Sequence, residues 1–239
     1  VVISYTDDQS ESNTITLTAT SDVDNVNDDP TGSVTISGTA TEDQVLTAAN
    51  TLADEDGLGT ISYQWKRAGT AISGATSSTY TLTQSDVGSA ITVTASYTDA
   101  QGTAESSTSS ATSAVANVND DPTGSVTISG TATEDQVLTA SNTLADEDVL
   151  GTITYTWSNG DTGSTTTLGQ SDVGNAITVT ATYTDGQGTA ESVASSATSA
   201  VANVNDDPTG SVTISGTATE DQVLTAANTL ADEDGLGTI

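Results

Sequence analysis

The stretch AITVTASYTD, residues 90–99, decides the fold of this chain. Its apolar residues alternate with threonine and serine, and they are Ile91, Val93, Ala95 and Tyr97. A period of two places apolar side chains on one face of a β-strand and hydroxyl side chains on the other. A nearly identical stretch, AITVTATYTD, recurs at residues 176–185. The pattern predicts a chain of half-buried strands in which no segment requires a helix.

A five-residue phrase divides the chain into repeats. VNDDP begins at Val26, Val118 and Val204, which gives periods of 92 and then 86 residues. The segments that follow each copy are nearly the same, and residues 31–61 are identical to residues 209–239. Such near-identity predicts an array that continues beyond both ends of this chain.

Four segments follow from these boundaries. They are the C-terminal part of a preceding repeat (1–30), two complete repeats (31–122 and 123–208) and the N-terminal part of a following repeat (209–239). The six-residue difference in period lies just after a tryptophan, where residues 63–88 are replaced by the shorter stretch 155–174. Loops tolerate such changes at small entropic cost, so a shortened loop or edge strand is expected there.

Each complete repeat has the pattern of an immunoglobulin-like β-sandwich. The strands predicted in the first one, separated by Gly and Asp clusters, lie near residues 33–38, 44–53, 60–67, 77–83, 90–99 and 104–117. About seven short strands in roughly 90 residues, with a tryptophan in the middle of the third, are typical of that fold. We therefore predict an all-β chain of tandem immunoglobulin-like sandwich domains in a linear array, with Trp65 and Trp157 in the cores.

The composition excludes several partners and chemistries. The chain has 2 Lys and Arg against 33 Asp and Glu, a formal net charge of −31, and neither His nor Cys. Nucleic acid and anionic membrane surfaces both require basic residues, so neither is expected as a partner. Nucleophilic triads are unavailable, and the carboxylates recur in every repeat without an evident pocket, so we expect no enzyme activity. No apolar run approaches the length of a membrane span.

The acidic residues are predicted to gather at the two ends of each sandwich. The turns TATEDQ and QSDVG lie where the chain leaves the sandwich, ADEDGLG and YTDAQG lie where it enters, and NVNDDP stands between consecutive domains. Two unit charges 4 Å apart repel by about 1 kcal/mol in water and several-fold more near a protein surface. A divalent cation relieves this repulsion, and Ca²⁺ takes roughly 6 to 8 oxygen ligands of the kinds that this chain offers.

We therefore predict calcium sites built from these turns and from the linkers. The candidate ligands are Asn27, Asp28, Asp29, Glu42, Asp43, Asp54, Asp56, Asp86, Asp99, Asn119, Asp120, Asp121, Glu134, Asp135, Asp146, Asp148, Asp172, Asp185, Asn205, Asp206, Asp207, Asp232 and Asp234. Pro30, Pro122 and Pro208 restrict the start of the next strand. A filled site is expected to stiffen a joint that bends without ions.

Structural interpretations of the same residues stay open. Asp and Asn favour turns on their own account, so the acids are also explained as solvated turn residues. Asp86, followed by Val87 and Gly88, is explained equally well as a structural corner before the sixth strand and as a metal ligand.

With DEDG, TYTLTQSDVG, AITVTASYTD, GTAES and NVNDDP in place, essentially the whole chain resembles the tandem immunoglobulin-like repeats of giant bacterial surface adhesins and related repetitive exoproteins. NVNDDP with TED and DED is also similar to the calcium-binding pattern of cadherins, although DDP lacks the second Asn of the usual cadherin phrase. The resemblance implies an extracellular protein, secreted or on the bacterial cell surface. It also implies a calcium-rigidified spacer that holds a terminal adhesive domain away from the cell, with neighbouring repeats of the same chain as its partners.

Two other functions remain as alternatives. Threonine-rich strands, as at residues 14–20 and 176–182, could present hydroxyl arrays to ice or to a sugar, although exposed β faces are rich in threonine for propensity reasons alone. The chain could also be the repeat subunit of an extracellular filament assembled head to tail, in which other copies of the chain are the partners.

Overall fold

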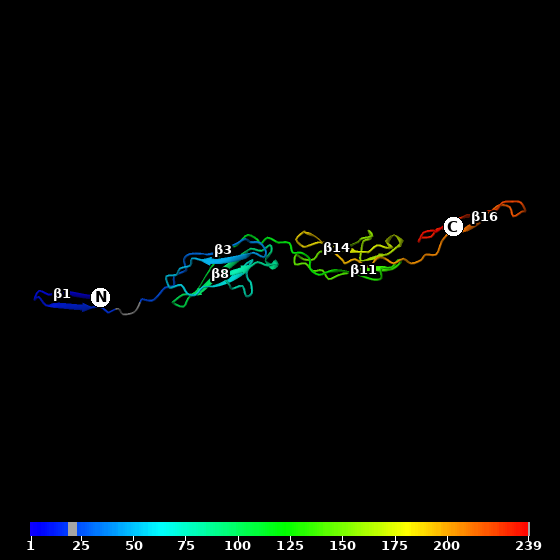
Figure 1. The fold of residues 1–239 in the computed structure, drawn as a ribbon. Coiled ribbons are helices and arrows are strands. Elements are labelled where there is room, and N and C mark those ends of the chain that lie inside the picture. Colours follow the sequence, from blue (N-terminus) through cyan, green and yellow to red (C-terminus); the bar gives the residue numbers. More distant parts are fainter. Residues whose placement is uncertain (19–22, 239) are drawn as a thin grey trace. The chain divides into compact units, whose positions relative to one another are not determined.

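The computed structural model describes residues 1–18 and 23–238, and within them the chain is all-β apart from two short 3₁₀ helices (Figure 1). The predicted fold class, tandem β-sandwich domains, is confirmed. The chain divides into two compact units, residues 1–117 and 118–239, each of which is described by itself. Part of the threonine-rich stretch at residues 14–20 lies outside the described residues.

The first sandwich consists of two antiparallel sheets. One sheet has the order β3 (Val34–Ser37), β4 (Val45–Asn50) and β7 (Thr79–Thr81); the other has the order β6 (Thr70–Ala71), β5 (Ser62–Arg67), β8 (Ile91–Thr98) and β9 (Ala104–Thr108). The 3₁₀ helix η1 (Gln84–Asp86) connects β7 to β8, so it carries the chain from one sheet to the other.

The second sandwich repeats this topology without a counterpart of β6. Its sheets are β10 (Val126–Ser129), β11 (Val137–Asn142) and β13 (Thr165–Thr167), and β12 (Thr154–Trp157), β14 (Val179–Thr184) and β15 (Ala190–Ala194), with η2 (Gln170–Asp172) before β14. A tight turn replaces β6. The backbone N–H of Trp157 donates to the Asp161 carbonyl, four residues on, whereas the backbone N–H of Trp65 donates to the carbonyl of the more distant Ala75. The six-residue difference between the repeats is thus a shortened edge hairpin.

The core of each sandwich follows from the alternation seen in the sequence. Along β8 every second side chain is buried. Trp65 on β5 is fully buried, stacks on Tyr80 with ring centroids 5.8 Å apart, and donates its indole N–H to the Ser77 carbonyl at 2.9 Å. Trp157 is also buried and donates in the same way to Gly163. Both predicted core tryptophans therefore lie in the cores, with their polar atoms satisfied.

The predicted last strand, residues 104–117, is interrupted. Regular pairing ends with β9 at Thr108, and then the Ser109 and Thr112 hydroxyls accept the N–H groups of Val93 and Ile91, each at 3.0 Å. Side-chain oxygens thus replace the backbone acceptors of a strand. The tail then forms isolated bridges, and Ala116 pairs in parallel with Thr41 beyond the end of β3.

The terminal segments form hairpins. They are β1 (Val2–Thr6) with β2 (Ser12–Thr16), and β16 (Val212–Ser215) with β17 (Thr225–Asn228). Val34 is 4% exposed in its complete sandwich, whereas Val212, in an identical stretch of sequence, is 65% exposed. The hairpin forms locally, but burial of its apolar face requires the second sheet of a sandwich.

We predict that Leu82→Ala destabilises the first sandwich by about 2–5 kcal/mol, because it leaves a cavity at a fully buried position. Each complete repeat contains one tryptophan, so urea unfolding followed by Trp65 fluorescence in a Trp157→Phe background reports this repeat alone. Leu58→Ala, at a residue that is 43% exposed, is the control and should cost much less. Equal losses in the two variants would contradict the assigned core.

Candidate metal sites of the repeats

Two turns of the first sandwich bring acidic residues to the end where the chain enters. The turn between β4 and β5 carries Asp54 and Asp56, and the turn between β8 and β9 carries Asp99. The Ala100 N–H donates to the carbonyl oxygens of both Asp56 and Gly57, each at 3.2 Å. This shared hydrogen bond holds the two turns against each other.

The preceding linker is bound to the same turns by the chain's own donors. The Asp28 N–H donates to Asp56 Oδ2 at 2.8 Å, and the Asn27 amide donates to Glu105 Oε1 at 2.9 Å. The Tyr97 hydroxyl donates to Asp54 Oδ2. We call Asp28, Asp54, Asp56, Asp99 and Glu105 the head cluster of the first repeat.

The same contacts recur in the second repeat, whose head cluster consists of Asp120, Asp146, Asp148, Asp185 and Glu191. The Asp120 N–H donates to Asp148 Oδ2 at 2.9 Å, the Asn119 amide donates to Glu191 at 3.0 Å, and the Tyr183 hydroxyl donates to Asp146. The linker bond is present a third time, from the Asp206 N–H to Asp234 Oδ2 at 2.9 Å. The arrangement is thus a property of the repeated sequence.

One carboxylate in each head cluster has a buried oxygen without a hydrogen-bond partner. Asp99 and Asp185 are both 6% exposed. In each, Oδ1 accepts two backbone N–H groups of the following turn, at 2.7–2.9 Å, whereas Oδ2 is buried and has no partner. A buried anionic oxygen is costly unless a cation or a donor compensates it. This orphaned oxygen is the feature that a bound cation would explain.

Hydrogen bonds from the following turn favour the ionised form of Asp185. Burial alone would raise the pKa of Asp185, but the N–H groups of Thr189, Gln187 and Gly188 lower the pKa overall. Burial and the hydrogen bond to Asp146 raise the pKa of Tyr183 well above its ordinary value, so its hydroxyl stays a donor. Asp185 therefore offers a carboxylate rather than a protonated acid at neutral pH.

A second group of carboxylates meets at the linker of residues 203–208. Oxygens of Glu134, Asp206 and Glu233 all lie within 4.8 Å of one another. Glu134 is 2% exposed and accepts the Val204 N–H at 3.1 Å. With its amide nitrogen facing Glu134, Gln170 donates to both oxygens of that carboxylate, at 2.7 and 3.1 Å. Gln170 and the linker backbone thus position a buried carboxylate beside two others.

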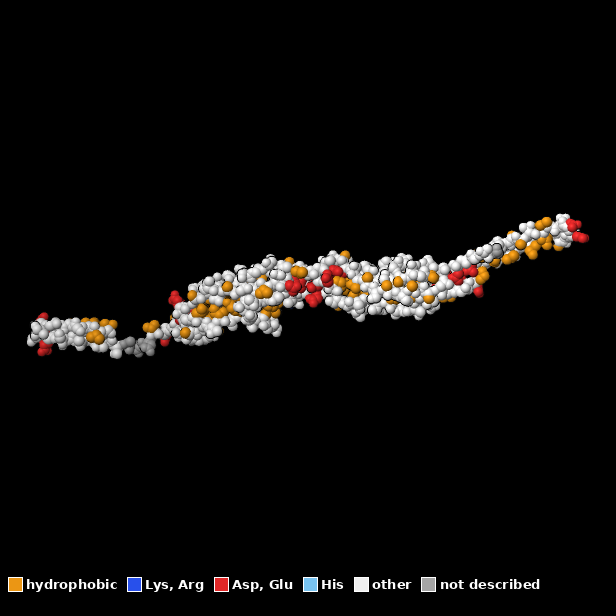
Figure 2. All heavy atoms as spheres, in the orientation of Figure 1, with side chains coloured by type: hydrophobic (Ala, Val, Ile, Leu, Met, Phe, Trp, Pro, Cys, Tyr) orange, Lys and Arg blue, Asp and Glu red, His pale blue; other side chains and the backbone are white. Residues whose placement is uncertain are grey.

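The negative charges near Asp206 repel one another when no cation is bound. Burial, followed by the neighbouring charges of Asp234, Asp135, Asp232 and Asp207, raises the pKa of Asp206. A raised pKa in the folded state contributes stability below the ordinary pKa, and that contribution is lost as the pH rises through the raised value. Without a cation, the site is therefore least favourable at neutral pH. Figure 2 shows the acidic side chains gathered in groups, with little other charge on the visible surface.

The donor set fits a hard divalent cation. The side chains gathered in both groups are carboxylates, and the chain has no His or Cys. Ca²⁺ binds oxygen ligands of these kinds in flexible geometry. The orphaned Oδ2 atoms of Asp99 and Asp185 add buried acceptors that no protein donor uses.

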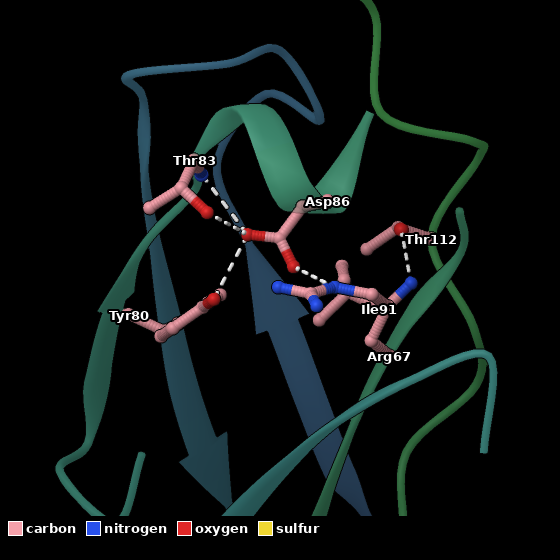
Figure 3. Close-up of polar contacts among 6 residues, drawn as sticks. All are labelled: Arg67, Tyr80, Thr83, Asp86, Ile91 and Thr112. Atoms are coloured by element: carbon pink, nitrogen blue, oxygen red, sulfur yellow. Dashed lines mark hydrogen bonds and ion pairs between the residues drawn. The ribbon is translucent and has the colours of Figure 1, made fainter. Parts of the chain in front are cut away.

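The sequence was compatible with Asp86 as a structural corner residue or as a metal ligand. In the structure, hydrogen-bond donors of the protein contact both of its carboxylate oxygens (Figure 3). Its Oδ1 accepts the Arg67 Nε–H at 2.7 Å, and its Oδ2 accepts the Tyr80 hydroxyl and the Thr83 N–H at 2.8 and 2.9 Å. Burial alone would raise the pKa of Asp86, but Arg67, then Thr83 and Tyr80, lower it below its ordinary value. These contacts favour the structural corner.

Asp172 is the equivalent corner residue of the second repeat and has a different set of partners. Its Oδ2 accepts the Gly169 N–H at 3.0 Å and an amide hydrogen of Asn159 at 3.4 Å. Asn159 takes the place of Arg67 in the sequence, so this corner has no basic partner. The corner itself persists because the backbone donor at the start of the 3₁₀ helix is common to both repeats.

The remaining predicted ligands are more peripheral. Asp43 and Asp135 are exposed and adopt a left-handed backbone conformation in the turn TED, which Asp tolerates. The second Asp of each linker is exposed, and these residues are Asp29, Asp121 and Asp207. Asn205 belongs to the third linker, where its amide donates to the Asp206 carbonyl, and Asp232 lies close enough to raise the pKa of Asp206. The linker of residues 117–122 falls at the boundary of the two units, so the convergence expected from Glu42 across it stays a prediction.

Four participants were missed by the sequence analysis. Glu105 and Glu191 pair directly across their hairpins with Tyr97 and Tyr183, so alignment of the motif GTAES with YTD in an antiparallel register could have found them. Glu233 is the middle residue of the third DED, of which only the two Asp residues were predicted as ligands. Gln170 is uncharged, so a search for acidic residues does not find it.

The hydroxyl faces of the sheets form shallow grooves. One, of about 450 Å³, is lined by Thr60, Ser62, Ser96, Thr98, Glu105 and Ser106, and an equivalent groove lies on the second sandwich. The hydroxyls bond to one another across the strands, as for Thr94 with Thr108 at 2.8 Å and Thr154 with Thr182 at 2.9 Å. Such pairs stabilise the sheet itself.

Comparisons with known proteins do not define a family for this chain. No protein-family model matches, and neither does any curated protein. Among solved structures, a Ca²⁺-stabilized adhesin that helps an Antarctic bacterium reach out and bind ice is 18% identical with a TM-score of 0.32, over 92% of this chain. This chain spans 60% of the length of that structure.

The tetra-tandem repeat in the extending region of a large adhesion protein is 21% identical, with a TM-score of 0.29, over 98% of this chain and 70% of that one. At these TM-scores neither likeness carries an argument about the site. Within residues 1–18 and 23–238, no helix has the length and apolar character of a membrane span.

We predict that Arg67→Gln destabilises the first sandwich by about 1–3 kcal/mol at neutral pH, since the buried Asp86 loses its charged donor. Because the folded-state pKa of Asp86 is lowered, its contribution is present above about pH 4 and is lost as the pH falls through the lowered value. The difference from the wild type should therefore shrink in acid.

Urea unfolding followed by Trp65 fluorescence at several pH values measures this difference, with Lys66→Gln as the matched control for removal of a neighbouring cation. A loss that is the same at all pH values, or equal in the two variants, would show that the ion pair is not the cause.

Proposed function

We propose that this chain is a non-catalytic extender of a bacterial cell-surface or secreted adhesin, in which Ca²⁺ at the head of each repeat stiffens the joint to the preceding linker. The observation that carries the proposal is the buried, unpartnered Oδ2 of Asp99 and of Asp185, placed in the same relation to the linker in both complete repeats.

The hydrogen bonds of the linker explain how ion binding would become stiffness. The linker N–H groups of Asp28 and Asp120 bond to a side-chain oxygen of Asp56 and Asp148, residues of the DED turns. A cation that holds the DED carboxylate in place also holds the acceptor of the linker. Without the cation, mutual repulsion among the carboxylates favours opening of the turn, and the linker loses its anchor.

The adhesin role comes from the resemblance of the repeated motifs to surface-adhesin repeats. An array of small sandwiches with hydroxyl-rich faces and acidic ends suits a spacer, because neighbouring repeats of the same chain are the only partners that it requires. The strong net negative charge, −31, also keeps such an array soluble and opposes pairing of exposed strand edges between copies.

The first test is thermal unfolding with small-angle scattering, in millimolar Ca²⁺ and then in chelator. Ligand that binds only the folded state raises stability by RT ln(1 + [L]/Kd), about 2.7 kcal/mol at a hundredfold excess over Kd. We expect a higher melting temperature and a longer particle with calcium. If neither quantity changes, the acids are turn residues only and the spacer is not calcium-dependent.

We further predict that Asp99→Asn with Asp185→Asn abolishes most of the calcium-induced rise in melting temperature. In chelator, the same variant should be at least as stable as the wild type, because removal of an uncompensated buried charge lowers repulsion. Asp8→Asn with Glu11→Gln, exposed acids outside the head clusters, is the control and should respond to calcium like the wild type. An undiminished calcium response in the Asp variant would exclude these residues as ligands.

A further inference from the structure

The two complete repeats differ at one pair of positions beside the head cluster. In the first repeat, Asp56 is followed by Gly57 and Asp99 is followed by Ala100. In the second repeat, valine takes the place of the glycine (Val149), and glycine takes the place of the alanine (Gly186). Each member of the pair directly follows a head-cluster aspartate. The two members face each other across the two turns, since the N–H of residue 100 or 186 donates to the carbonyl of residue 57 or 149.

Only one side chain fits between the turns. A Cβ at residue 57 would lie 3.0 Å from the Ala100 Cβ, and a Cβ at residue 186 would lie 3.0 Å from the Val149 Cβ and 2.7 Å from the Asp148 carbonyl oxygen. These separations are below ordinary van der Waals contact. The two substitutions therefore compensate each other, with the side chain on one turn in the first repeat and on the other turn in the second.

The pair also acts on the hydrogen bond that joins the turns. The Ala100 N–H donates to the carbonyls of Asp56 and Gly57 at 3.2 Å each, whereas the Gly186 N–H donates to those of Asp148 and Val149 at 2.9 and 3.0 Å. Both repeats thus keep the hydrogen bond that sets the spacing of the two turns. The residues that set this spacing contribute no carboxylate themselves.

The second repeat adopts its turn against a backbone preference. Val149 has φ +77°, in the left-handed region, where Gly57 of the first repeat has φ +98°. Glycine adopts that region freely, but a β-branched residue there is a conformational outlier. Val149 is 65% exposed, so burial of its side chain does not compensate the strain. Such strain is maintained only where the surroundings hold it.

We propose that this pair grades the cation affinity of the head clusters, so that the cluster of the second repeat binds Ca²⁺ more weakly than that of the first. The inference rests on the proposed calcium role. In the ion-free protein, Val149 favours opening of the DED turn and lowers the fraction of molecules in the binding-competent conformation. A competent fraction of about one fifth raises the apparent Kd about fivefold. Joints of one array would then stiffen at different calcium concentrations.

The test is an exchange of the pair between the repeats in the 239-residue chain. Val149→Gly with Gly186→Ala gives the second repeat the pair of the first, and Gly57→Val with Ala100→Gly does the reverse. Amide hydrogen exchange followed by mass spectrometry resolves the two DED turns in peptides that extend through Ser62 or Thr154, because these positions still differ after the exchange. The midpoint of protection is measured for each turn as Ca²⁺ is titrated into chelated protein.

In the wild type, the midpoint of the second turn is expected at a severalfold higher calcium concentration than that of the first, and each exchange should move the midpoint of its own repeat to the other value. Equal midpoints in the wild type, or an order that survives the exchange, would overturn the inference. So would an exchange that changes protection in chelator alone and leaves the midpoints in place, because the pair would then be structural only.

Failure of the proposed function has a separate signature, which is that calcium protects neither turn in any variant. Gly186→Ala alone is the packing control. It should weaken protection in chelator, because the new Cβ meets both Val149 and the Asp148 carbonyl, and Val149→Gly should restore it.

Discussion

Repulsion among carboxylates held at the head of each repeat is the constraint on which the arrangement depends. The acidic turns follow β4 and β8 in the first sandwich and β11 and β14 in the second, and in each a shared backbone hydrogen bond joins the two turns. The linker N–H and a buried tyrosine then bond to the same acids. These donors position the carboxylates without neutralising them, and the Oδ2 of Asp99 is left without any donor. A site that is organised but not neutralised is suited to a divalent cation.

The role of each carboxylate is decided by the supply of donors rather than by residue type. Asp86 is fully buried, yet Arg67, Tyr80 and Thr83 satisfy both of its oxygens. It belongs to the structure of the corner, and the chain uses one of its two basic residues there. Asp99 receives only backbone N–H groups on a single oxygen. The difference between the two residues is a matter of geometry that the local sequence does not reveal.

The repeats combine a constant framework with variation at a few places. The strands, the tryptophan, the corner and the linker contacts are common to both complete repeats, while the edge hairpin and the pair beside the head cluster differ. The buried core residues are equivalent in the two repeats, while Ile72, Ala75 and Tyr80 pack against the first core alone. Under the proposed calcium role, such variation tunes the joints of an array separately while each repeat keeps one fold.

The sequence by itself determined the all-β class, the strands, the tryptophan cores and the turns that carry acids, because strand periodicity and turn chemistry are local. It could not determine which acids are satisfied. The donors of Asp86 come from three different elements, and the partners of Asp99 and of Glu134 depend on how turns and linker meet. The interrupted last strand and the reciprocal packing of Val149 with Gly186 were likewise decided by the tertiary structure. Contacts between residues far apart in the chain leave no periodic signal, so only the folded arrangement shows them.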